Sequence, residues 1–288
     1  MVTPMTPSGQ VDVPAAVRLA THLVDHGNDG LVLNGTTGEA PTTHAPEKAA
    51  LIAAVVEAVG ERAVIIAGAG SNDTLHAVRM AEQAAAAGAH GILVVSPYYS
   101  RPSQEGVYRH ALAVVEATDL PVMLYDVPGR TGVRYAPATV QRLAEHERVV
   151  AIKDASGDLY LAAKAIAATG LAGYSGDDAA YLALLAHGAA GVVSVVGHVA
   201  GPQLAALTAA FDAGDTARAL AIFLSIAPAI DALNGAGFQT VAAKAALEVL
   251  GLIGGRDVRL PNVAATDDEV AAVRVGLVAA GLLEPVTS

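Results

Sequence analysis

The sequence predicts an α/β fold, namely a TIM (β/α)8 barrel with a C-terminal helical extension. Over about the first two-thirds of the 288 residues, short apolar runs alternate with longer runs rich in Ala, Leu and charged residues at helical spacing. The short runs are continuously apolar, which is typical of parallel strands covered on both faces. From about residue 202 onward only helix-type runs follow. These observations together predict a barrel followed by helices.

The strand-type runs are separated by enough residues for one helix each. They lie at 30–35, 63–70, 91–99, 121–128, 149–156, 172–178 and 191–197. The opening MVTPM is expected to supply an eighth strand, because eight β/α units in roughly 200 to 250 residues is the count of a TIM barrel. A doubly wound open sheet is the alternative, but its first strand would normally lead into a glycine-rich phosphate loop. GAGSND at 68–73 does not complete G-x-G-x-x-G, so we interpret it as a strand end and turn.

The helix-type runs complete the pattern. They are expected at 13–27, 46–59, 73–88, 106–118, 136–146, 158–170 and 179–188, and then at 202–214, 215–233, 239–251 and 268–283. The last begins with Thr266 and Glu269 in the spacing of a capping box. We therefore expect a catalytic barrel over 1–214 and a helical domain over 215–288.

Composition excludes several classes of function. The formal net charge of -11 and the absence of a basic run argue against binding to nucleic acid or an anionic membrane. The chain has no cysteine, which excludes disulfides, thiolate nucleophiles and cysteine-ligated zinc and fits a cytoplasmic protein. The nine histidines form neither H-x-H nor H-E-x-x-H, so we expect no metal site. His198 follows a strand end, and it either faces the pocket or packs on the helix side.

No membrane segment is expected. The opening MVTPMTPSGQ lacks the basic and apolar regions of a secretory signal. The longest apolar run, 219–233, contains Pro228 and Asp231 and is shorter than the roughly 20 clean residues of a membrane span.

The lysine at the end of one strand is the main candidate for chemistry. The chain has four lysines, and a solvated helical position would explain Lys48, Lys164 and Lys244. Lys153 instead ends the apolar run VVAI. A cation at the end of an apolar strand requires a chemical reason.

Strand periodicity indicates where the side chain of Lys153 points. Val149, Ala151 and Lys153 share one face, which is expected to be the inside of the barrel mouth, while Val150 and Ile152 are expected to pack on the helices. Burial lowers the pKa of an amine from about 10.4, and a free amine in a dry pocket attacks carbonyls to form a Schiff base. A structural ion pair with a carboxylate such as Asp154 is the alternative. Position and periodicity alone leave both interpretations open.

Other polar groups follow neighbouring strands, whose C-terminal ends share one rim in a barrel. Tyr125 ends the preceding strand, and its phenol could carry protons to and from a carbinolamine. Thr36 and Thr37, in GTTGE at 35–39, offer hydroxyls and turn amides for a carboxylate, although the same residues would also make an ordinary polar turn. Arg130 follows a Pro-Gly turn and either grips a second carboxylate or is solvated.

Several motifs occur in the order and at the spacings of one enzyme family. They are GTTGE (35–39), SPYYSRPSQEG (96–106), YDVPGRTG (125–132), KDASGD (153–158), YSGDD (174–178) and GVVSV (191–195), followed by RLPNVAATDDEV (259–270). In this combination the chain resembles the dihydrodipicolinate synthase family, the 4-hydroxy-tetrahydrodipicolinate synthases of lysine and diaminopimelate biosynthesis. The resemblance covers almost the whole chain, although the family usually has several more residues before the TP that stands here at 3–4.

The resemblance implies a role for each candidate residue. Lys153 is implied to form the Schiff base with pyruvate. Tyr125, Thr36 and Tyr99 are implied to form a proton relay, with Tyr99 reaching into the active site of a neighbouring subunit. Thr37 and the backbone at Val193 are implied to contact the pyruvate carboxylate, and Arg130 to receive the carboxylate of L-aspartate 4-semialdehyde. The family further implies a homotetramer built from tight dimers, with no cofactor.

Two other functions are compatible with part of this pattern. An N-acetylneuraminate lyase or a 2-keto-3-deoxy sugar-acid aldolase would keep the lysine and the carboxylate turn. Arg130 and the Tyr98-Tyr99 pair favour the synthase. A non-catalytic keto-acid sensor is the third hypothesis, and the joint presence of the Schiff-base lysine and the three relay residues argues against it.

Overall fold

The computed structural model describes residues 1–235 and 237–285. The chain folds into two compact units: unit 1 comprises Met1–Ala63 and Ser194–Ser288, and unit 2 comprises Val64–Val193.

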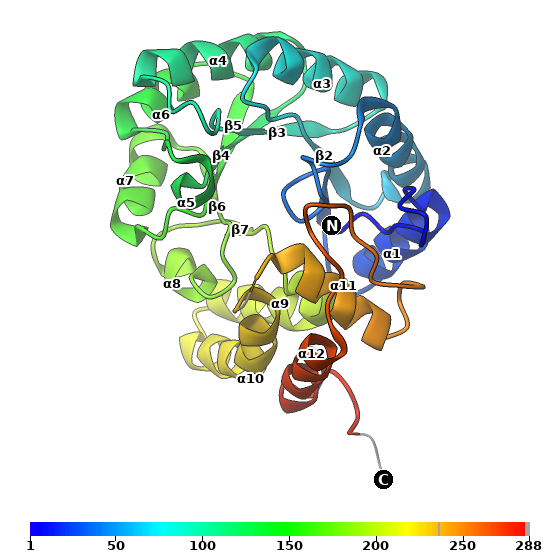
Figure 1. Cartoon of the computed structure of the whole chain (residues 1–288). Coiled ribbons are helices and arrows are strands. Elements are labelled where there is room, and N and C mark those ends of the chain that lie inside the picture. Colours follow the sequence, from blue (N-terminus) through cyan, green and yellow to red (C-terminus); the bar gives the residue numbers. More distant parts are fainter. Residues whose placement is uncertain (236, 286–288) are drawn as a thin grey trace. The chain divides into compact units, whose positions relative to one another are not determined.

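Unit 2 is a curved parallel sheet with helices along its outer side (Figure 1). Its strands pair in chain order: β2 Val64–Gly68, β3 Gly91–Val95, β4 Val122–Asp126, β5 Val149–Asp154, β6 Ala172–Ser175 and β7 Gly191–Val192. The helices are α3 Thr74–Ala86, α4 Gln104–Glu116, α5 Pro128–Thr131, α6 Pro137–Ala144, α7 Leu159–Thr169 and α8 Tyr181–Ala186. The predicted alternation is therefore confirmed in this unit, apart from the short α5, which the sequence did not indicate.

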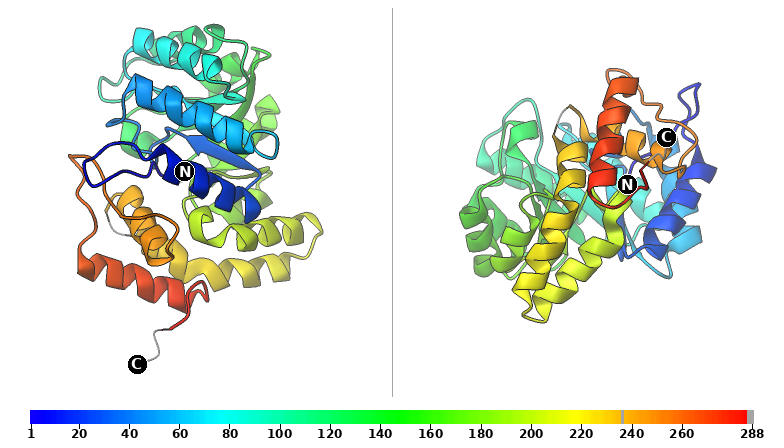
Figure 2. Two further views of the ribbon diagram at one scale, coloured as in Figure 1. Left: turned by 90° about the vertical axis from the view of Figure 1, so that its right-hand side faces the viewer. Right: turned by 90° about the horizontal axis from the view of Figure 1, so that it is seen from below.

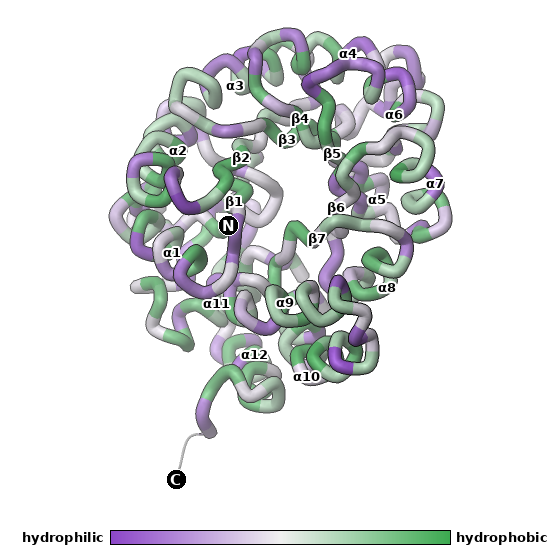
Figure 3. Tube along the Cα trace, turned by 180° about the vertical axis from the view of Figure 1, so that it is seen from behind, coloured by the Kyte–Doolittle hydropathy of each residue, from purple (hydrophilic) through white to green (hydrophobic). Residues whose placement is uncertain are grey.

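Strands β3 and β4 of unit 2 are buried on both faces, as their continuous apolar runs predict. Every residue of β4 is buried, and hydrophobic colour follows β3 to β5 while hydrophilic stretches lie over α4 and α6 (Figure 3). The helices begin at residues suited to capping, since the side chains of Asp73, Ser103 and Asp158 accept hydrogen bonds from the first turns of α3, α4 and α7.

The expected position of Val150 is wrong. Val150 is 47% exposed instead of packed against helices. The register shifts at this point, because Val122 pairs with Val149 whereas Met123 pairs with Ala151. A bulge of this kind leaves one residue outside the ladder, and beyond it Ala151 and Lys153 return to one face.

Unit 1 combines an N-terminal β/α segment with a group of helices. It contains α1 Val13–Asp25, β1 Gly30–Leu33, α2 Ala45–Val59, α9 Gly197–Asp212, α10 Thr216–Asn234, α11 Gln239–Val249 and α12 Asp267–Ala279. Helix α10 packs against α9 and α12 (Figure 2). The capping box predicted before the last helix is present, with Thr266 accepting from the Glu269 amide and Glu269 accepting from the Thr266 amide.

The opening MVTPM does not form the expected strand. Met5 makes an isolated antiparallel bridge with Val11, and no regular strand precedes β1 in the described residues. Pro4 has no N–H for a ladder. The N–H groups before Pro4 make isolated hydrogen bonds and no strand ladder. The Met1 terminus donates to the Val32 carbonyl at 2.7 Å, and the Val2 amide donates to the His198 ring at 2.9 Å.

Helix α10 is long and apolar enough, by length and composition, to cross a membrane. It is the one helix in the described residues that meets this criterion. Because core helices of soluble proteins meet it as well, this is weak evidence for a membrane span.

Two of the three lysines expected in solvated positions are buried. Lys164 is exposed as expected, but Lys244 is 0% exposed and Lys48 is 7% exposed. Lys244 forms an ion pair with Glu39 at 2.5 Å, and Lys48 donates to the carbonyls of Ala40 and Thr43 at 2.8 Å each. Their flanking alanines and leucines make these helix faces core rather than surface.

His198 packs inside unit 1. Its Nδ1 lies 2.7 Å from the Val195 carbonyl, and its Nε2 accepts from the Val2 amide. Because a carbonyl requires a donor and an amide requires an acceptor, the ring is neutral with its proton on Nδ1. Burial lowers the pKa of His198 to about 3.

We expect His198 to make unit 1 sensitive to acid. The pKa of His198 in the folded chain lies below the unfolded value of 6.5. Its contribution to the free energy of unfolding is therefore fully present above pH 6.5 and is lost as the pH falls toward 3. Denaturant unfolding should therefore show a loss of about 2 kcal/mol from this group between pH 7 and pH 5. In His198→Gln, which keeps an acceptor for Val2, this part of the pH dependence should disappear; an unchanged pH profile would contradict the assignment.

Candidate active site

Strand register in unit 2 places Lys153 between two tyrosines. Lys153 pairs with Tyr125 of β4 on one side and with Tyr174 of β6 on the other. Its Nζ lies 4.2 Å from the centroid of the Tyr125 ring, and Tyr125 is 6% exposed. The sequence-predicted pair of lysine and tyrosine is thus in contact.

The surroundings of Lys153 favour its neutral amine. Burial is the main cause and lowers its pKa to about 8, the positive charge of Arg130 acts in the same direction, and the buried carboxylate of Asp178 opposes it. About a tenth of the amine is then unprotonated at pH 7, against roughly one part in several thousand for an ordinary lysine. The side chain also retains some exposed surface. A partly accessible free amine is the requirement for a nucleophile.

Gly176 leaves room for the lysine. A Cβ on this residue would lie 2.8 Å from Cε of Lys153, 2.8 Å from Cβ of Ala155 and 3.2 Å from the Asp154 carbonyl. The residue follows β6, and its amide donates to that same carbonyl at 2.6 Å. The glycine of the YSGDD motif is therefore required by the close approach of both Ala155 and Lys153, which sequence reasoning did not identify.

Helix α5 presents Arg130 and fixes the loop that carries Tyr99. Arg130 is exposed, within one turn that ends at Gly132 in the left-handed region. The Tyr99 amide donates to the Thr131 carbonyl at 3.2 Å. Tyr99 itself has φ of +74° and is 88% exposed, so its ring projects away from unit 2.

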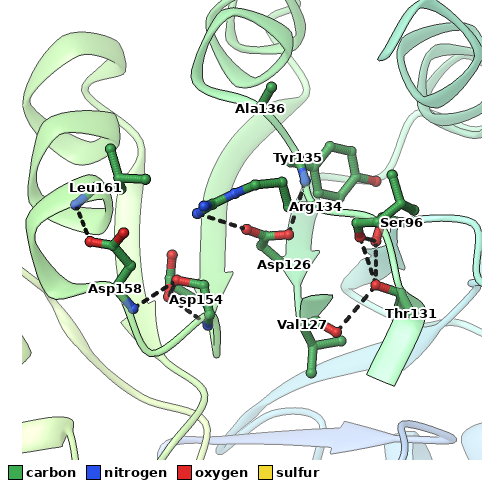
Figure 4. A network of polar contacts seen from close by, with 12 residues as sticks. Ser96, Asp126, Val127, Thr131, Arg134, Tyr135, Ala136, Asp154, Asp158 and Leu161 are labelled. Atoms are coloured by element: carbon green, nitrogen blue, oxygen red, sulfur yellow. Dashed lines mark hydrogen bonds and ion pairs between the residues drawn. The ribbon is translucent and has the colours of Figure 1, made fainter. Parts of the chain in front are cut away.

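A second polar cluster, which sequence reasoning missed, lies at the ends of β4 and β5 and in the loops that follow them (Figure 4). Asp126 and Asp154 pair in the register next to the tyrosine and the lysine. Asp126 accepts from the Tyr135 amide at 2.9 Å and lies 3.9 Å from the Arg134 guanidinium. Burial raises the pKa of Asp126 to about 6, and burial also raises the pKa of Asp154.

Asp154 does not pair with Lys153, for two reasons. Successive residues of a strand point to opposite faces, and the Asp154 carboxylate accepts from the amide and hydroxyl of Ser156 at 2.9 and 2.8 Å. The structural ion pair between Lys153 and Asp154 that the sequence left open is therefore not formed.

Val193 follows the short strand β7. Its amide donates to the Ser175 carbonyl at 2.8 Å. This donor is used within the sheet, so the carbonyl oxygen and the side chain of Val193 are the groups left for a ligand.

In unit 1, Thr36 and Thr37 lie in the turn after β1. The turn closes through bonds from the Gly38 and Ala40 amides to the Gly35 carbonyl, at 3.0 and 3.2 Å. Within residues 1–235 and 237–285, the hydroxyls and amides of Thr36 and Thr37 donate no hydrogen bond to protein. The turn thus offers a small group of donors of the kind that binds a carboxylate.

Comparison with known proteins gives matches along nearly the whole chain. The Dihydrodipicolinate synthetase family matches residues 1–280. A 4-hydroxy-tetrahydrodipicolinate synthase of Kineococcus radiotolerans is 53% identical over 98% of this chain and 92% of its own. Among solved structures, the dihydrodipicolinate synthase of Cyanidioschyzon merolae with lysine bound has a TM-score of 0.95 at 40% identity, covering 98% of this chain and 97% of its own. The pyruvate complex of the Acinetobacter baumannii enzyme has a TM-score of 0.94 at 36% identity, with the same two coverages.

We expect Gly176→Ala to impair the lysine without unfolding the chain. The added Cβ displaces the flexible end of Lys153 from Tyr125, so imine formation with an α-keto acid, trapped by borohydride, should slow at least about 10-fold. Gly254→Ala is the matched control, because its Cβ meets no atom within 4 Å. Equal trapping rates in both variants would show that the approach of Gly176 does not constrain the amine.

Proposed function

Because the chain belongs to the dihydrodipicolinate synthetase family, we propose that it condenses pyruvate with L-aspartate 4-semialdehyde to give 4-hydroxy-tetrahydrodipicolinate. This is a lyase reaction of the class I aldolase type, in lysine and diaminopimelate biosynthesis. The observation that carries the proposal is the amine of Lys153, held over the Tyr125 ring with its pKa lowered to about 8. The relatives reported above carry the synthase name, so the sugar-acid aldolase alternative is not favoured.

In the proposed reaction the amine of Lys153 is first the nucleophile and finally the leaving group. The Nζ of Lys153 adds to C2 of pyruvate, and loss of water from the carbinolamine gives a protonated imine. Loss of a C3 proton gives an enamine, whose carbon attacks the aldehyde of the second substrate. The amino group of that substrate then closes the ring at C2 and displaces the lysine, which regenerates the enzyme.

The remaining candidates take the roles that this chemistry requires. Tyr125, in contact with the amine, exchanges protons with the carbinolamine, and Thr36 and Tyr99 continue the relay. Thr37 and its turn bind the pyruvate carboxylate. Val193 is expected from the resemblance to contact the pyruvate carboxylate through its backbone, but its amide already donates to a carbonyl of β6, and a carbonyl oxygen cannot donate to a carboxylate. We therefore propose that the carbonyl oxygen of Val193 accepts from the protonated imine instead.

Two exposed side chains fit the second substrate and the assembly. Arg130 lies exposed at the rim, where a bidentate guanidinium can receive the carboxylate of the aldehyde substrate. Tyr99, 88% exposed, is suited to enter a neighbouring subunit. We accordingly propose a cytoplasmic homotetramer, a dimer of dimers, with a TIM-type catalytic barrel over 1–214, in which the expected first strand is not regular, and a C-terminal helical domain over 215–288.

The direct test is covalent trapping. Incubation with pyruvate and borohydride should add one reduced pyruvate per chain, and peptide mapping should locate it on Lys153. Lys244 and Lys48 serve as internal controls because both are buried and hydrogen-bonded. A label on either of them, or on Lys164, would refute the proposed nucleophile.

Arg130→Ala should separate the two half-reactions. Pyruvate trapping should stay nearly intact, whereas kcat/KM for the semialdehyde should fall by the equivalent of roughly 2 to 5 kcal/mol, as for loss of one partner of a desolvated charge pair. Arg109→Ala, at an exposed helix pair, is the control. If Arg130→Ala reduces trapping and condensation equally, Arg130 acts on the site's structure and not on the second substrate.

A further inference from the structure

The turn that carries Thr36 and Thr37 is held by residues more than 200 positions later in the chain. The Thr240 hydroxyl, in α11, donates to the Thr37 carbonyl at 2.9 Å, and Thr240 is 0% exposed. From the other side, the Thr3 hydroxyl donates to the Gly38 carbonyl at 2.7 Å. All of these residues belong to unit 1. The backbone of the turn is thus fixed from two directions.

A buried carboxylate follows directly after these residues. Glu39 is 1% exposed, and its Oε1 lies 2.5 Å from Nζ of Lys244, which is 0% exposed. Its Oε2 accepts from the Arg259 amide at 2.9 Å, and Lys244 also donates to the Asp257 carbonyl at 2.6 Å. A buried ion pair is tolerated only where such additional hydrogen bonds satisfy both charges. Glu39 has φ of +59°, a conformation that needs this support.

The far end of the same segment is anchored as well. The Arg259 guanidinium donates to both carboxylate oxygens of Glu47, at 2.8 and 2.5 Å, and to the Thr42 carbonyl at 2.8 Å. The segment 35–47 is therefore bound along its length by α11 and the residues that follow it.

This anchoring contrasts with the unused donors of the turn. The backbone carbonyls of 37 and 38 are hydrogen-bonded, whereas the hydroxyls and amides of Thr36 and Thr37 donate to no protein acceptor in the described residues. The protein has fixed the position of these donors without occupying them, which is the preorganisation expected of a binding turn.

We propose that Thr240, Lys244 and Glu39 are positioning residues that set the Thr36–Thr37 turn for the carboxylate of an α-keto acid. The inference rests on the proposed function and deepens it, because it assigns part of the substrate affinity to α11, which acts through its hydrogen bond to the turn. Thr240 holds the turn directly, and the Glu39–Lys244 pair fixes the backbone conformation that follows it.

A merely structural role would change stability and leave affinity unchanged. Thr240→Val keeps the shape of the side chain and removes only its hydrogen bond, so the chain should fold. We expect it to raise the pyruvate KM about fivefold, the order of effect of one neutral hydrogen bond, with the semialdehyde KM within about twofold. Thr240→Ser should restore the wild-type pyruvate KM. Thr21→Val, which removes a helix hydroxyl bond to Val17 in the same unit, is the control and should leave it unchanged.

The ion pair provides a second, independent variant. Lys244→Met leaves a buried charge on Glu39 and should lower the melting temperature. We also expect Lys244→Met to raise the pyruvate KM. The double variant Glu39→Gln with Lys244→Met removes both charges and should regain part of the lost melting temperature, while its pyruvate KM should remain above that of the wild type. Recovery of the pyruvate KM together with the melting temperature would overturn the positioning role of the pair.

The deciding experiment compares pyruvate trapping in wild type, Thr240→Val and Thr240→Ser as a function of pyruvate concentration. A higher half-saturating concentration in Thr240→Val, with wild-type behaviour in Thr240→Ser and Thr21→Val, supports the inference. If the wild type traps pyruvate and all variants match it, this inference alone fails. If the wild type traps no pyruvate, the proposed function fails and the inference fails with it.

Discussion

The chemistry assigned to this chain depends on the desolvation of one amine. The register of β4, β5 and β6 places Lys153 beside Tyr125 and opposite the bare backbone of Gly176. Removal of water from an ammonium is costly, and the cost is reduced when the proton is lost. A strand that ends in lysine among apolar neighbours therefore becomes a source of free amine near neutral pH. Asp178 keeps the effect moderate, so the amine can still be protonated during turnover.

The acidic layer behind this site serves a different purpose. Asp126 and Asp154 point away from the lysine face, and their hydrogen bonds to Tyr135 and Ser156 tie the strand ends to the loops that follow. In unit 1, Glu39 and Lys244 do the same for the turn of Thr36 and Thr37. In both units, buried charges and hydrogen bonds fix the backbone next to the proposed functional groups, which are the amine of Lys153 and the donors of Thr36 and Thr37.

Much of this arrangement could be predicted from the sequence, and the failures have physical causes. Continuous apolar runs located the strands, and period-two alternation placed Lys153 and Ala151 on one face. The exposure of Val150 escaped prediction because the bulge arises from pairing with Val122 and Met123, not from local composition. The burial of Lys244 depends on Glu39, 205 residues away, although its alanine-rich neighbours were a usable signal. Tyr99 and Val193 were assigned roles by family resemblance alone. The resemblance also selected the roles of Thr37 and Arg130, for which the residues by themselves left an ordinary polar turn and a solvated arginine open.

The measurement that tests the central claim most directly is the pKa of the Lys153 amine in the free enzyme. It can be obtained from the pH dependence of the rate at which a small amine-reactive electrophile modifies Lys153, with peptide mapping to locate the label. Exposed Lys164 serves as the reference in the same sample. The account predicts an inflection near pH 8 for Lys153. An inflection of Lys153 near the ordinary lysine value of about 10.4 would contradict it, because the amine would then be solvated and would not be an activated nucleophile.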